Sequence, residues 1–330
     1  MTYVDPNGNV TASASQGLMS LWIGVQKDSS ADYLAFVESE EDGWNIVLDE
    51  EKGKTFSELF RTDCTLSLRN LLAVEYLHDY VFGFEFSDEQ QKSVEEKIDT
   101  VAKSFGSMSA FEQEMEKYGA TVSDYERYLV LMLKQTTLFN TFYNEGGMRV
   151  ITEQSKQQMF RDKYAIAYHI FFDMRGTVKD DGTVVSLTQE EKQAKTAFAN
   201  EVYEKIKKGE IPFENALLQY TEDAYASKYS SGYFITDDGK YFKEFTDGVF
   251  SLSAGEITMV QSQAGFHIIK RYPMDEALYD ADEDVYAAIT EKLITQDFSG
   301  LISSVSDGVV MNDEVIGQLD ASLIKPFAGF

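Results

Sequence analysis

Apolar side chains recur at helical spacing over most of the chain. From 17 to 36, and again from 56 to 82, they return every three or four positions, which predicts amphipathic helices. The charged stretch between these segments, EEDGWNIVLDEEKGK, is typical of a turn or a short hairpin. Residues 1–16 are small and polar, and we expect a flexible lead-in there. The N-terminal part is therefore predicted to be mainly helical.

Capping sequences predict where the next helices begin and end. Ser87 followed by Gln90 is a capping-box pattern, and so is Ser123 followed by Glu126. We expect a further helix to begin after Thr152. Glycines can adopt the left-handed backbone that ends a helix. Two of them are expected to end helices here: Gly106 and Gly119.

The pattern changes at residue 165 from helical spacing to β-rich runs. Four runs are predicted strands: AIAYHIFFDM, GYFI, GEITMVQ and AGFHIIKRY. After the first strand, DDGT at 180–183 marks a turn, and a long helix ending at Gly209 is followed by a shorter one. A helix-like stretch, FKEFTDGVFSL, separates the second and third strands. The predicted order is β–α–α–(α)–β–α–β–β, in which one short helix is left open.

Helical patterns flank this mixed region on both sides. After Pro273 the chain returns to an acidic helical pattern that runs to residue 306. We infer an α+β module inserted into a mostly α-helical domain that is built from both ends of the chain. The predicted parts are an N-terminal helical domain (1–162), the inserted module (163–274) and a C-terminal helical segment (275–330) that completes the first domain.

Composition and charge narrow the classes of function. Hydrophobic residues make up 43% of the 330, which is enough for packed cores and excludes wholesale disorder. The 56 acidic residues outnumber the 29 basic ones, which gives a formal net charge of −27. This balance opposes binding to phosphate backbones, so we expect no nucleic-acid partner. The simplest role of the charge is to keep the protein soluble.

Cysteine and hydropathy add little about the compartment. Cys64 is the only cysteine, so an intrachain disulfide is excluded. No segment reaches the ~20 apolar residues of a membrane helix. The best candidate for a signal peptide, LMSLWIGV at 18–25, is too short and lacks a basic flank. If the natural protein is exported, we expect its leader to lie outside this sequence.

Common catalytic motifs fail, and two histidines remain. The chain has no GxSxG elbow, P-loop, HExxH pair or GxGxxG. Two of its three histidines, His169 and His267, lie in strand-like runs at opposite ends of the module. A small closed sheet often brings its first and last strands together, which would place both rings near one another. From the pattern alone, a structural and a functional role stay open for the pair.

The sequence between the histidines decides between these alternatives. In order, the module carries YHIFF, PFENALLQYTED, EFTDGVFSLSAGEI and GFHIIK, and the stretch 219–234 is QYTEDAYASKYSSGYF. Over residues 164–273 this series resembles the parvulin family of peptidyl-prolyl cis/trans isomerases. The resemblance implies a β-α3-β-α-β2 fold and an activity that needs no cofactor and no metal.

The resemblance also implies which residues form the site. His169 and His267 fall on the floor histidines, and Asp223 takes the position beside the substrate carbonyl, where capping the AYASK turn is its alternative role. Residues expected to bind substrate are Tyr241, Phe245 and Phe250 on the apolar wall, and Ser262 near the second histidine. Many parvulins carry a hydroxyl residue where this chain has Ala264, and Ser262 is the expected substitute. The loop after His169 lacks a basic cluster, so we expect no preference for phosphorylated residues before proline.

The helical flanks resemble the N-terminal domain of extracytoplasmic foldases of the SurA and PrsA kind. The segment FSDEQQKSVEEKI and the stretches up to ITEQSKQQMFRDKY carry this second resemblance. It implies that unfolded or partly folded secreted polypeptides with X–Pro bonds are the clients. It also implies an extracytoplasmic location, as a bacterial cell-surface lipoprotein whose only membrane contact is an N-terminal lipid anchor, and leaves a homodimer open. Methionines and aromatic residues whose chemistry suits adaptable client binding are Met108, Met115, Met132, Phe139, Phe142 and Tyr143, and most of them are expected to be ordinary core residues.

Two functions compete on these observations. The first is an exported foldase that isomerises X–Pro bonds in its clients. The second is a holdase chaperone whose isomerase module has little or no activity. Tyr241, which is larger and more polar than the methionine of many relatives, and Ala264 favour the second function and predict weak activity.

Overall fold

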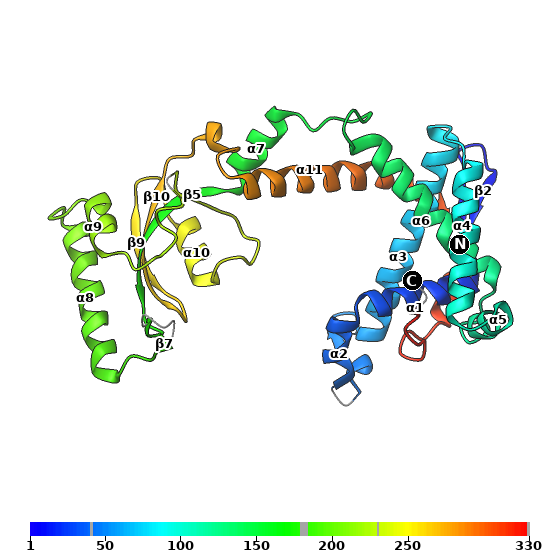
Figure 1. The fold of residues 1–330 in the computed structure, drawn as a ribbon, viewed down its shortest axis with the longest axis horizontal. Coiled ribbons are helices and arrows are strands. Elements are labelled where there is room, and N and C mark those ends of the chain that lie inside the picture. Colours follow the sequence, from blue (N-terminus) through cyan, green and yellow to red (C-terminus); the bar gives the residue numbers. More distant parts are fainter. Residues whose placement is uncertain (40–41, 179–183, 230, 329–330) are drawn as a thin grey trace. The chain divides into compact units, whose positions relative to one another are not determined.

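The computed structural model describes residues 1–39, 42–178, 184–229 and 231–328, and it divides into two compact units (Figure 1). The first unit comprises Met1–Val150 and Thr295–Phe330, and the second comprises Ile151–Ile294. The predicted turn at 180–183 lies outside the described residues.

The first unit is mostly helical. Its helices are α1 (Gln16–Ser29), α2 (Ala31–Ser39), α3 (Phe56–Tyr76), α4 (Asp88–Ser104), α5 (Met108–Glu116), α6 (Val122–Tyr143), α12 (Asp313–Gly317), the C-terminal part of α11 (Glu283–Ser303), and the short turns η1 (Gly43–Asn45), η2 (Leu77–Val81) and η4 (Ser306–Gly308). The segment 17–36, expected to be helical, forms two helices, because the first ends at Ser29 with Ser30 as its C-cap and the second begins at Ala31. The predicted hairpin between them and α3 is confirmed as β3 (Val47–Asp49) paired with β4 (Lys54–Thr55).

The expectation of a flexible lead-in at the N-terminus is wrong. β1 (Thr2–Val4) lies between β2 (Val10–Ser13) and β11 (Val309–Val310) in an antiparallel three-stranded sheet. Tyr3 is buried, stacks on Tyr76 with ring centroids 4.3 Å apart, and donates its hydroxyl to the Val305 carbonyl. The pairing partner of β1 is distant in the sequence, so the polar composition of residues 1–16 could not reveal it.

Two of the predicted helix starts are confirmed and one is shifted. Ser87 and Gln90 form a capping box at α4, and Thr152 caps α7 (Glu153–Lys163). At α6 the capping box is formed by Thr121 and Asp124 rather than by Ser123 and Glu126. Both pairs satisfy the same sequence pattern, so the pattern alone could not fix the register. The glycines expected to end helices, Gly106 and Gly119, adopt positive φ angles.

Buried charges join α3 to α6 in the first unit. Glu75 accepts hydrogen bonds from both terminal nitrogens of Arg127 and from Lys134 Nζ at 2.8 Å. Lys134 also donates to Asp79 at 2.5 Å, and Asp79 lies 2.6 Å from Nδ1 of His78, the fully buried third histidine. Burial raises the pKa of Glu75, but the hydrogen bonds from the two cations outweigh it and hold this pKa below its ordinary value.

The second unit is built around an antiparallel sheet of order β8-β5-β10-β9. Its strands and helices are α7, β5 (Ala165–Asp173), β6 (Thr177–Val178), β7 (Val184–Val185), α8 (Gln189–Lys207), α9 (Phe213–Tyr220), β8 (Tyr233–Ile235), α10 (Lys243–Ser251), β9 (Ile257–Gln261), β10 (Gly265–Tyr272), η3 (Glu276–Leu278) and the N-terminal part of α11. The third helix that was left open is a turn at residues 224–228. The predicted neighbours β5 and β10 are confirmed as adjacent strands.

Helices cover both faces of this sheet (Figure 1). α8 and α9 pack on one face against Ile170, Phe172 and Ile268. α10 packs on the other face against Ala165, Ala167 and Ile269. Successive residues of a strand point to opposite faces, so His169 on β5 and His267 on β10 both face α10. This face of the sheet holds the candidate site.

Candidate active site

His169 and His267 meet across the β5–β10 ladder. Ile269 is the ladder partner of His169 and Phe171 is the partner of His267, so the histidines are diagonal neighbours. Their Nδ1 atoms lie 3.1 Å apart, and their rings are nearly parallel with centroids separated by 5.2 Å. The antiparallel register therefore brings together two side chains from the two ends of the module.

Gly265 begins the strand that carries His267. Its φ angle of 154° favours glycine, and a Cβ atom at this position would lie 2.0 Å from the Phe172 carbonyl oxygen. A side chain here would push β10 away from β5. The glycine before the histidine is thus required by the close approach of the two strands.

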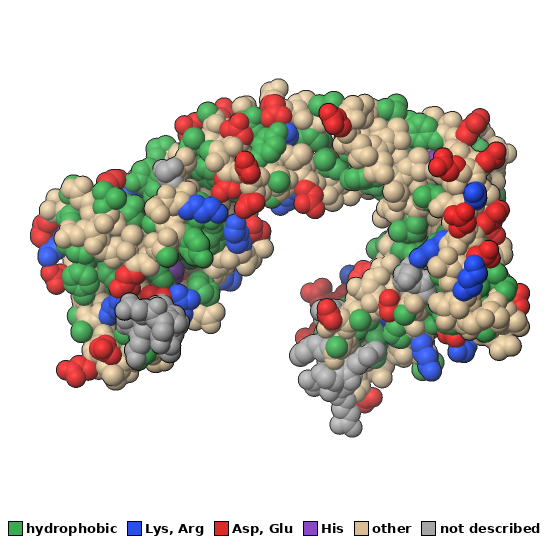
Figure 2. Space-filling view, viewed as in Figure 1, with side chains coloured by type: hydrophobic (Ala, Val, Ile, Leu, Met, Phe, Trp, Pro, Cys, Tyr) green, Lys and Arg blue, Asp and Glu red, His purple; other side chains and the backbone are tan. Residues whose placement is uncertain are grey.

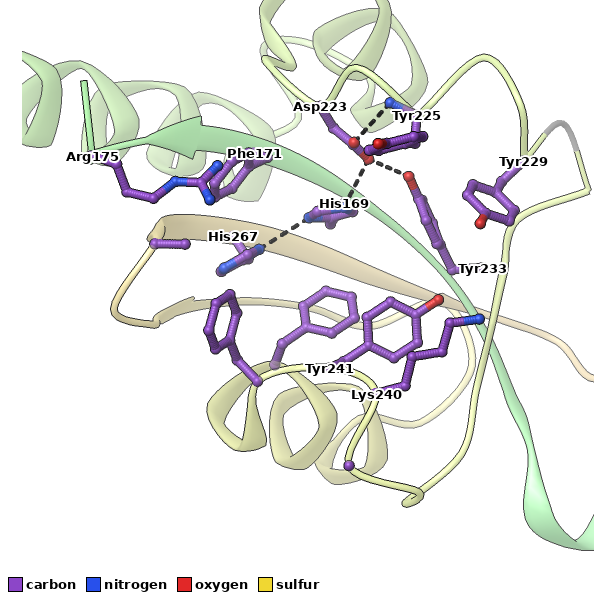
Figure 3. Close-up of a pocket in the computed structure, with 14 residues that line it drawn as sticks. His169, Phe171, Arg175, Asp223, Tyr225, Tyr229, Tyr233, Lys240, Tyr241 and His267 are labelled. Carbon is purple, nitrogen blue, oxygen red and sulfur yellow. Dashed lines mark hydrogen bonds and ion pairs between the residues drawn. The ribbon is translucent and has the colours of Figure 1, made fainter. Parts of the chain in front are cut away.

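Asp223 lies next to His169, and its carboxylate has three hydrogen-bond partners (Figure 3). Its Oδ2 atom lies 3.1 Å from His169 Nε2 and accepts the hydroxyl of Tyr233. Its Oδ1 atom accepts the backbone N–H of Tyr225 at 3.0 Å, so the carboxylate also caps the turn that follows. Burial raises the pKa of Asp223, but hydrogen bonds from His169, Tyr233 and Tyr225 outweigh it and lower the pKa to about 2. The group is a carboxylate at physiological pH.

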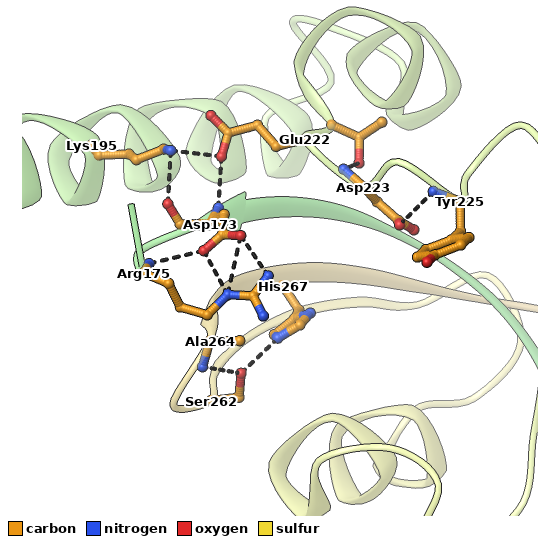
Figure 4. Close-up of polar contacts among 10 residues, drawn as sticks. Asp173, Arg175, Lys195, Glu222, Asp223, Tyr225, Ser262, Ala264 and His267 are labelled. Atoms are coloured by element: carbon orange, nitrogen blue, oxygen red, sulfur yellow. Dashed lines mark hydrogen bonds and ion pairs between the residues drawn. The ribbon is translucent and has the colours of Figure 1, made fainter. Parts of the chain in front are cut away.

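Ser262 occupies the other end of the histidine pair (Figure 4). Its hydroxyl lies 2.9 Å from His267 Nε2 and accepts the backbone N–H of Ala264 at 3.1 Å. Burial first, and then the neighbouring His169, lower the pKa of His267 to about 3. The His267 ring is therefore neutral at physiological pH, with Ser262 as its hydroxyl partner in place of a residue at position 264.

One arrangement of protons satisfies every contact when both rings are neutral. Because ionised Asp223 can only accept, His169 must carry its proton on Nε2, which leaves Nδ1 as an acceptor. His267 must then donate from Nδ1, and its Nε2 accepts the Ser262 hydroxyl. The side chains form a directed chain of hydrogen bonds that begins at Ser262 and ends at Asp223.

Aromatic residues line a cavity of about 470 Å³ next to these hydrogen-bonded side chains (Figure 3). Its lining residues are His169, Phe171, Arg175, Asp223, Tyr225, Tyr229, Tyr233, Gly239, Lys240, Tyr241, Phe242, Phe245, Ala264 and His267. The Phe245 ring lies 5.0 Å from His169 and 5.2 Å from His267, and Tyr241 lies 5.7 Å from Phe245. The cavity thus combines an apolar wall with a polar floor.

Phe250 does not line the cavity, contrary to the expectation from the sequence. It is 39% exposed, and Arg271 lies over its ring. At about 100° per residue, Phe250 lies about 140° around α10 from Phe245, which faces the cavity. Phe242 precedes Phe245 by three positions, lies on the same side, and lines the cavity instead.

Three tyrosines that line the cavity were not predicted from the sequence. Tyr225 and Tyr229 lie in the loop after Asp223, and Tyr233 begins β8. The signal was present in the tyrosine-rich stretch AYASKYSSGYF. The place of these tyrosines in the cavity depends on the path of the chain after Asp223, which periodicity does not report.

Arg175, in the described part of the loop after β5, is held in an internal ion pair (Figure 4). Arg175 donates from Nε to Asp173 Oδ1 at 3.0 Å and from Nη2 to Oδ2 at 2.6 Å. Lys195 pairs with Glu222 at 2.6 Å and donates to the Asp173 carbonyl. The charge of Arg175 is therefore already matched at the rim of the cavity.

Within residues 1–39, 42–178, 184–229 and 231–328, no group of three or more His, Cys, Asp or Glu side chains could hold a metal ion. Among the same residues, no helix combines the length and apolarity needed to cross a membrane.

The order and spacing of the site match a known family. The family model described as Rotamase, PPIC-type PPIASE domain, matches residues 169–272, a range that begins at His169 and includes Asp223 and His267. The chain carries a parvulin-type peptidyl-prolyl isomerase domain. The strand order and the helices on both faces of the sheet therefore belong to the isomerase domain.

Curated relatives extend the similarity beyond the isomerase domain. The foldase protein PrsA of Oceanobacillus iheyensis is 29% identical over 257 residues, which cover 76% of this chain and 72% of that protein. The foldase protein PrsA of Staphylococcus aureus is 22% identical over 246 residues, covering 69% and 72%. The chain is a homologue of the PrsA foldases.

Two solved structures align over most of the chain. PrsA from Bacillus subtilis covers 81% of this chain and 89% of its own, with 20% identity and a TM-score of 0.27. PrsA from Bacillus cereus covers 82% and 95%, with 19% identity and a TM-score of 0.30.

Proposed function

We propose that the isomerase domain twists X–Pro bonds of client chains inside the aromatic cavity. The observation that supports this most is the hydrogen-bonded chain from Ser262 to Asp223, whose members His267, His169 and Asp223 line that cavity. Ser262, which the sequence suggested as a substrate-binding residue, is buried behind His267 and does not line the cavity. In this proposal His169, His267 and Asp223 surround the carbonyl of the residue before proline. Tyr241, Phe242 and Phe245 enclose the pyrrolidine ring.

The chemistry requires binding rather than bond formation. An X–Pro bond isomerises slowly because its partial double bond must twist over a barrier of roughly 18–20 kcal/mol. The planar amide carries partial charges on oxygen and nitrogen that water stabilises, and twisting removes the resonance that creates them. A slot with aromatic walls excludes water, so it favours the twisted amide over the planar one.

The charge state of the floor suits this task. An imidazolium beside the carbonyl oxygen would stabilise the charge-separated planar amide and would therefore slow the reaction. The lowered pKa of His267 keeps its ring neutral. The Asp223 carboxylate, placed near the carbonyl, would disfavour negative charge on the oxygen and so would assist twisting.

We propose clients without a phosphorylated residue before proline. In the described part of the loop after β5, Arg175 is the cation that lines the cavity, and Asp173 already neutralises it. A phosphate group binds best to several unpaired cations held together. Neutral or singly charged residues before proline are therefore the expected substrates.

We propose that the helical parts, residues 1–162 together with 275–330, bind unfolded secreted chains while residues 163–274 isomerise them. The relatives named foldase support this division of labour. Of the six methionines and aromatic residues considered for client binding, Met115 and Phe142 are buried core residues, whereas Met108 and Phe139 are more than one-third exposed. Phe139 also lines a groove of about 310 Å³ between α6 and the C-terminal part of α11. An extracytoplasmic location, an N-terminal lipid anchor and a homodimer are parts of the same proposal.

A holdase with weak isomerase activity is the second candidate, and exposed apolar residues on the first unit favour it. These residues include Tyr80, Val81, Phe139, Met148 and Val150. Acidic side chains are scattered over the visible face of both units, which would keep a complex with a client in solution (Figure 2).

One pair of assays separates the two candidates. Cis–trans exchange of Ala-Pro and Glu-Pro peptides is measured by NMR for the wild type and for His267→Ala. In parallel, suppression of client aggregation is measured for these proteins, for Phe139→Ser, and for Leu218→Ser as a control on exposed α9. The foldase proposal expects exchange that His267→Ala abolishes and aggregation suppression that Phe139→Ser alone weakens. A wild type that suppresses aggregation without any exchange would leave only the holdase.

A further inference from the structure

We infer that Tyr233 is a positioning residue of the isomerase site, whose phenol holds the Asp223 carboxylate against His169. The inference deepens the proposed function and rests on it, because the role of Asp223 in catalysis belongs to that proposal. Tyr233 reaches the site from β8, the strand beside β5, so the contact links two strands and a loop.

The Tyr233 side chain has little freedom to move. It is 6% exposed, and its ring packs edge-on against His169 with centroids 5.3 Å apart. On another side, the ring of Tyr229 lies 4.4 Å away. The ladder pairs Tyr233 with Ala167, two positions before His169 on β5. Packing on the sheet therefore aims the phenol at Asp223.

Two donors share one oxygen of the carboxylate. Asp223 Oδ2 accepts both the Tyr233 hydroxyl and His169 Nε2, while Oδ1 is taken by the backbone of Tyr225. Burial first, and then the hydrogen bond to Asp223, raise the pKa of Tyr233, so the phenol stays protonated and donates. Without it, Oδ2 would keep His169 as its side-chain donor and the carboxylate could turn about its Cβ–Cγ bond.

Several charged and titratable groups surround Asp223, but few of them form a hydrogen bond with its carboxylate. His169 on β5 and His267 on β10 lie along the hydrogen-bonded chain, and Tyr229 and Tyr241 face the cavity beside Tyr233. Lys240 and Arg175 line the same cavity from its rim. Of these, His169 and Tyr233 are the side chains with a hydrogen bond to Asp223.

The first test measures the carboxylate itself. In Tyr233→Phe, the titration of the Asp223 carboxyl carbon, followed by ¹³C NMR between pH 1 and pH 6, should move up by about one pH unit, because a buried carboxylate loses a charge-assisted donor. Incorporating 3-fluorotyrosine at position 233 makes the phenol a stronger donor and should move the titration down. Tyr220→Phe, which removes a phenol from the α8–α9 face, should leave it unchanged.

The second test asks whether Tyr233 acts through Asp223. Tyr233→Phe should lower kcat/KM for an Ala-Pro peptide about tenfold in the wild type. In an Asp223→Ala background the same change should alter kcat/KM less than about twofold, because the partner is gone. A merely structural role would cost the same in both backgrounds.

The outcomes separate this inference from the proposed function. An unshifted Asp223 titration in both Tyr233 variants, or equal losses in both backgrounds, overturns the role of Tyr233. A wild type without measurable exchange overturns the proposed function and with it any catalytic role of Tyr233. In that case the titration still decides whether the phenol holds the carboxylate.

Discussion

The Nδ1 atoms of His169 and His267 lie 3.1 Å apart, although 98 positions separate the two residues in the sequence. The antiparallel β5–β10 register creates this contact, and Asp223 and Ser262 extend it on both sides. A substitution at any of these four residues should therefore alter the hydrogen bonds of the others.

The neutral state of His267 makes the isomerase domain sensitive to acid. In the unfolded chain the His267 ring is protonated below about pH 6.5, whereas in the folded domain it stays neutral until the pH approaches about 3. Stability is therefore complete above pH 6.5 and is lost as the pH falls through this window. Between pH 6.5 and pH 5 the wild type should lose about 2 kcal/mol of unfolding free energy that His267→Gln does not lose.

The choice of probe matters for that measurement. Both tryptophans, Trp22 and Trp44, lie in the first unit, so their fluorescence follows that unit. Urea unfolding of the isomerase domain is instead followed by the NMR amide signals of β5 and β10. Equal pH dependence in wild type and His267→Gln would contradict the burial of a neutral ring.

Ser262→Ala removes the partner of two buried groups, His267 Nε2 and the N–H of Ala264. We expect kcat/KM to fall about tenfold, since an unsatisfied buried polar group costs about 1–3 kcal/mol. Ser262→Thr keeps the hydroxyl and should retain most of the activity. If alanine and threonine behave alike in the peptide exchange assay, the hydroxyl has no role in orienting His267.

Lys134→Met should destabilise the first unit by about 3–5 kcal/mol, because Glu75 and Asp79 then share a buried site with one cation fewer. Urea unfolding followed by tryptophan fluorescence measures the loss. A Glu75→Leu/Lys134→Met double variant should be less destabilised than the sum of the two single variants. Strict additivity would mean that the two charges do not interact.

Phe327→Ala should lower the stability of the same unit by about 3–5 kcal/mol, because a fully buried ring is removed. The ring packs against Phe105, Tyr118 and Tyr125, and its backbone N–H donates to the Gly24 carbonyl. Leu323→Ala is the matched control, since Leu323 is 79% exposed in the same segment. Equal midpoints of urea unfolding for both variants, measured by tryptophan fluorescence, would contradict the buried position of Phe327.

Much of the fold and site of the isomerase domain could be predicted from the sequence because the patterns that indicate them lie within short segments. The β-rich runs AIAYHIFF and AGFHIIKRY predict two strands, in which every second side chain shares a face, and the parvulin resemblance implies that His169, Asp223 and His267 converge. Phe250 was misplaced because a motif position does not report the angle around α10. Tyr233 was missed because its contact depends on the path of a loop.

The fold of the first unit was harder to predict from the sequence, since the contacts that define it join distant segments. Polar residues 1–16 gave no sign that β1 would pair with β11. The capping register at α6 was ambiguous because Thr121 and Ser123 both precede an acidic residue by three positions. The buried charges between α3 and α6 interrupt an apolar pattern that otherwise predicts the helices well.

The β1–β11 pairing and the burial of Phe327 impose an order on biosynthesis. Residues 151–294 are contiguous, so the isomerase domain can fold as soon as they leave the ribosome, whereas the first unit must wait for residues 309–327. Contacts between such distant segments close slowly. The part proposed to hold clients is therefore completed last, and until then its own N-terminal helices expose the kind of surface that a chaperone would recognise.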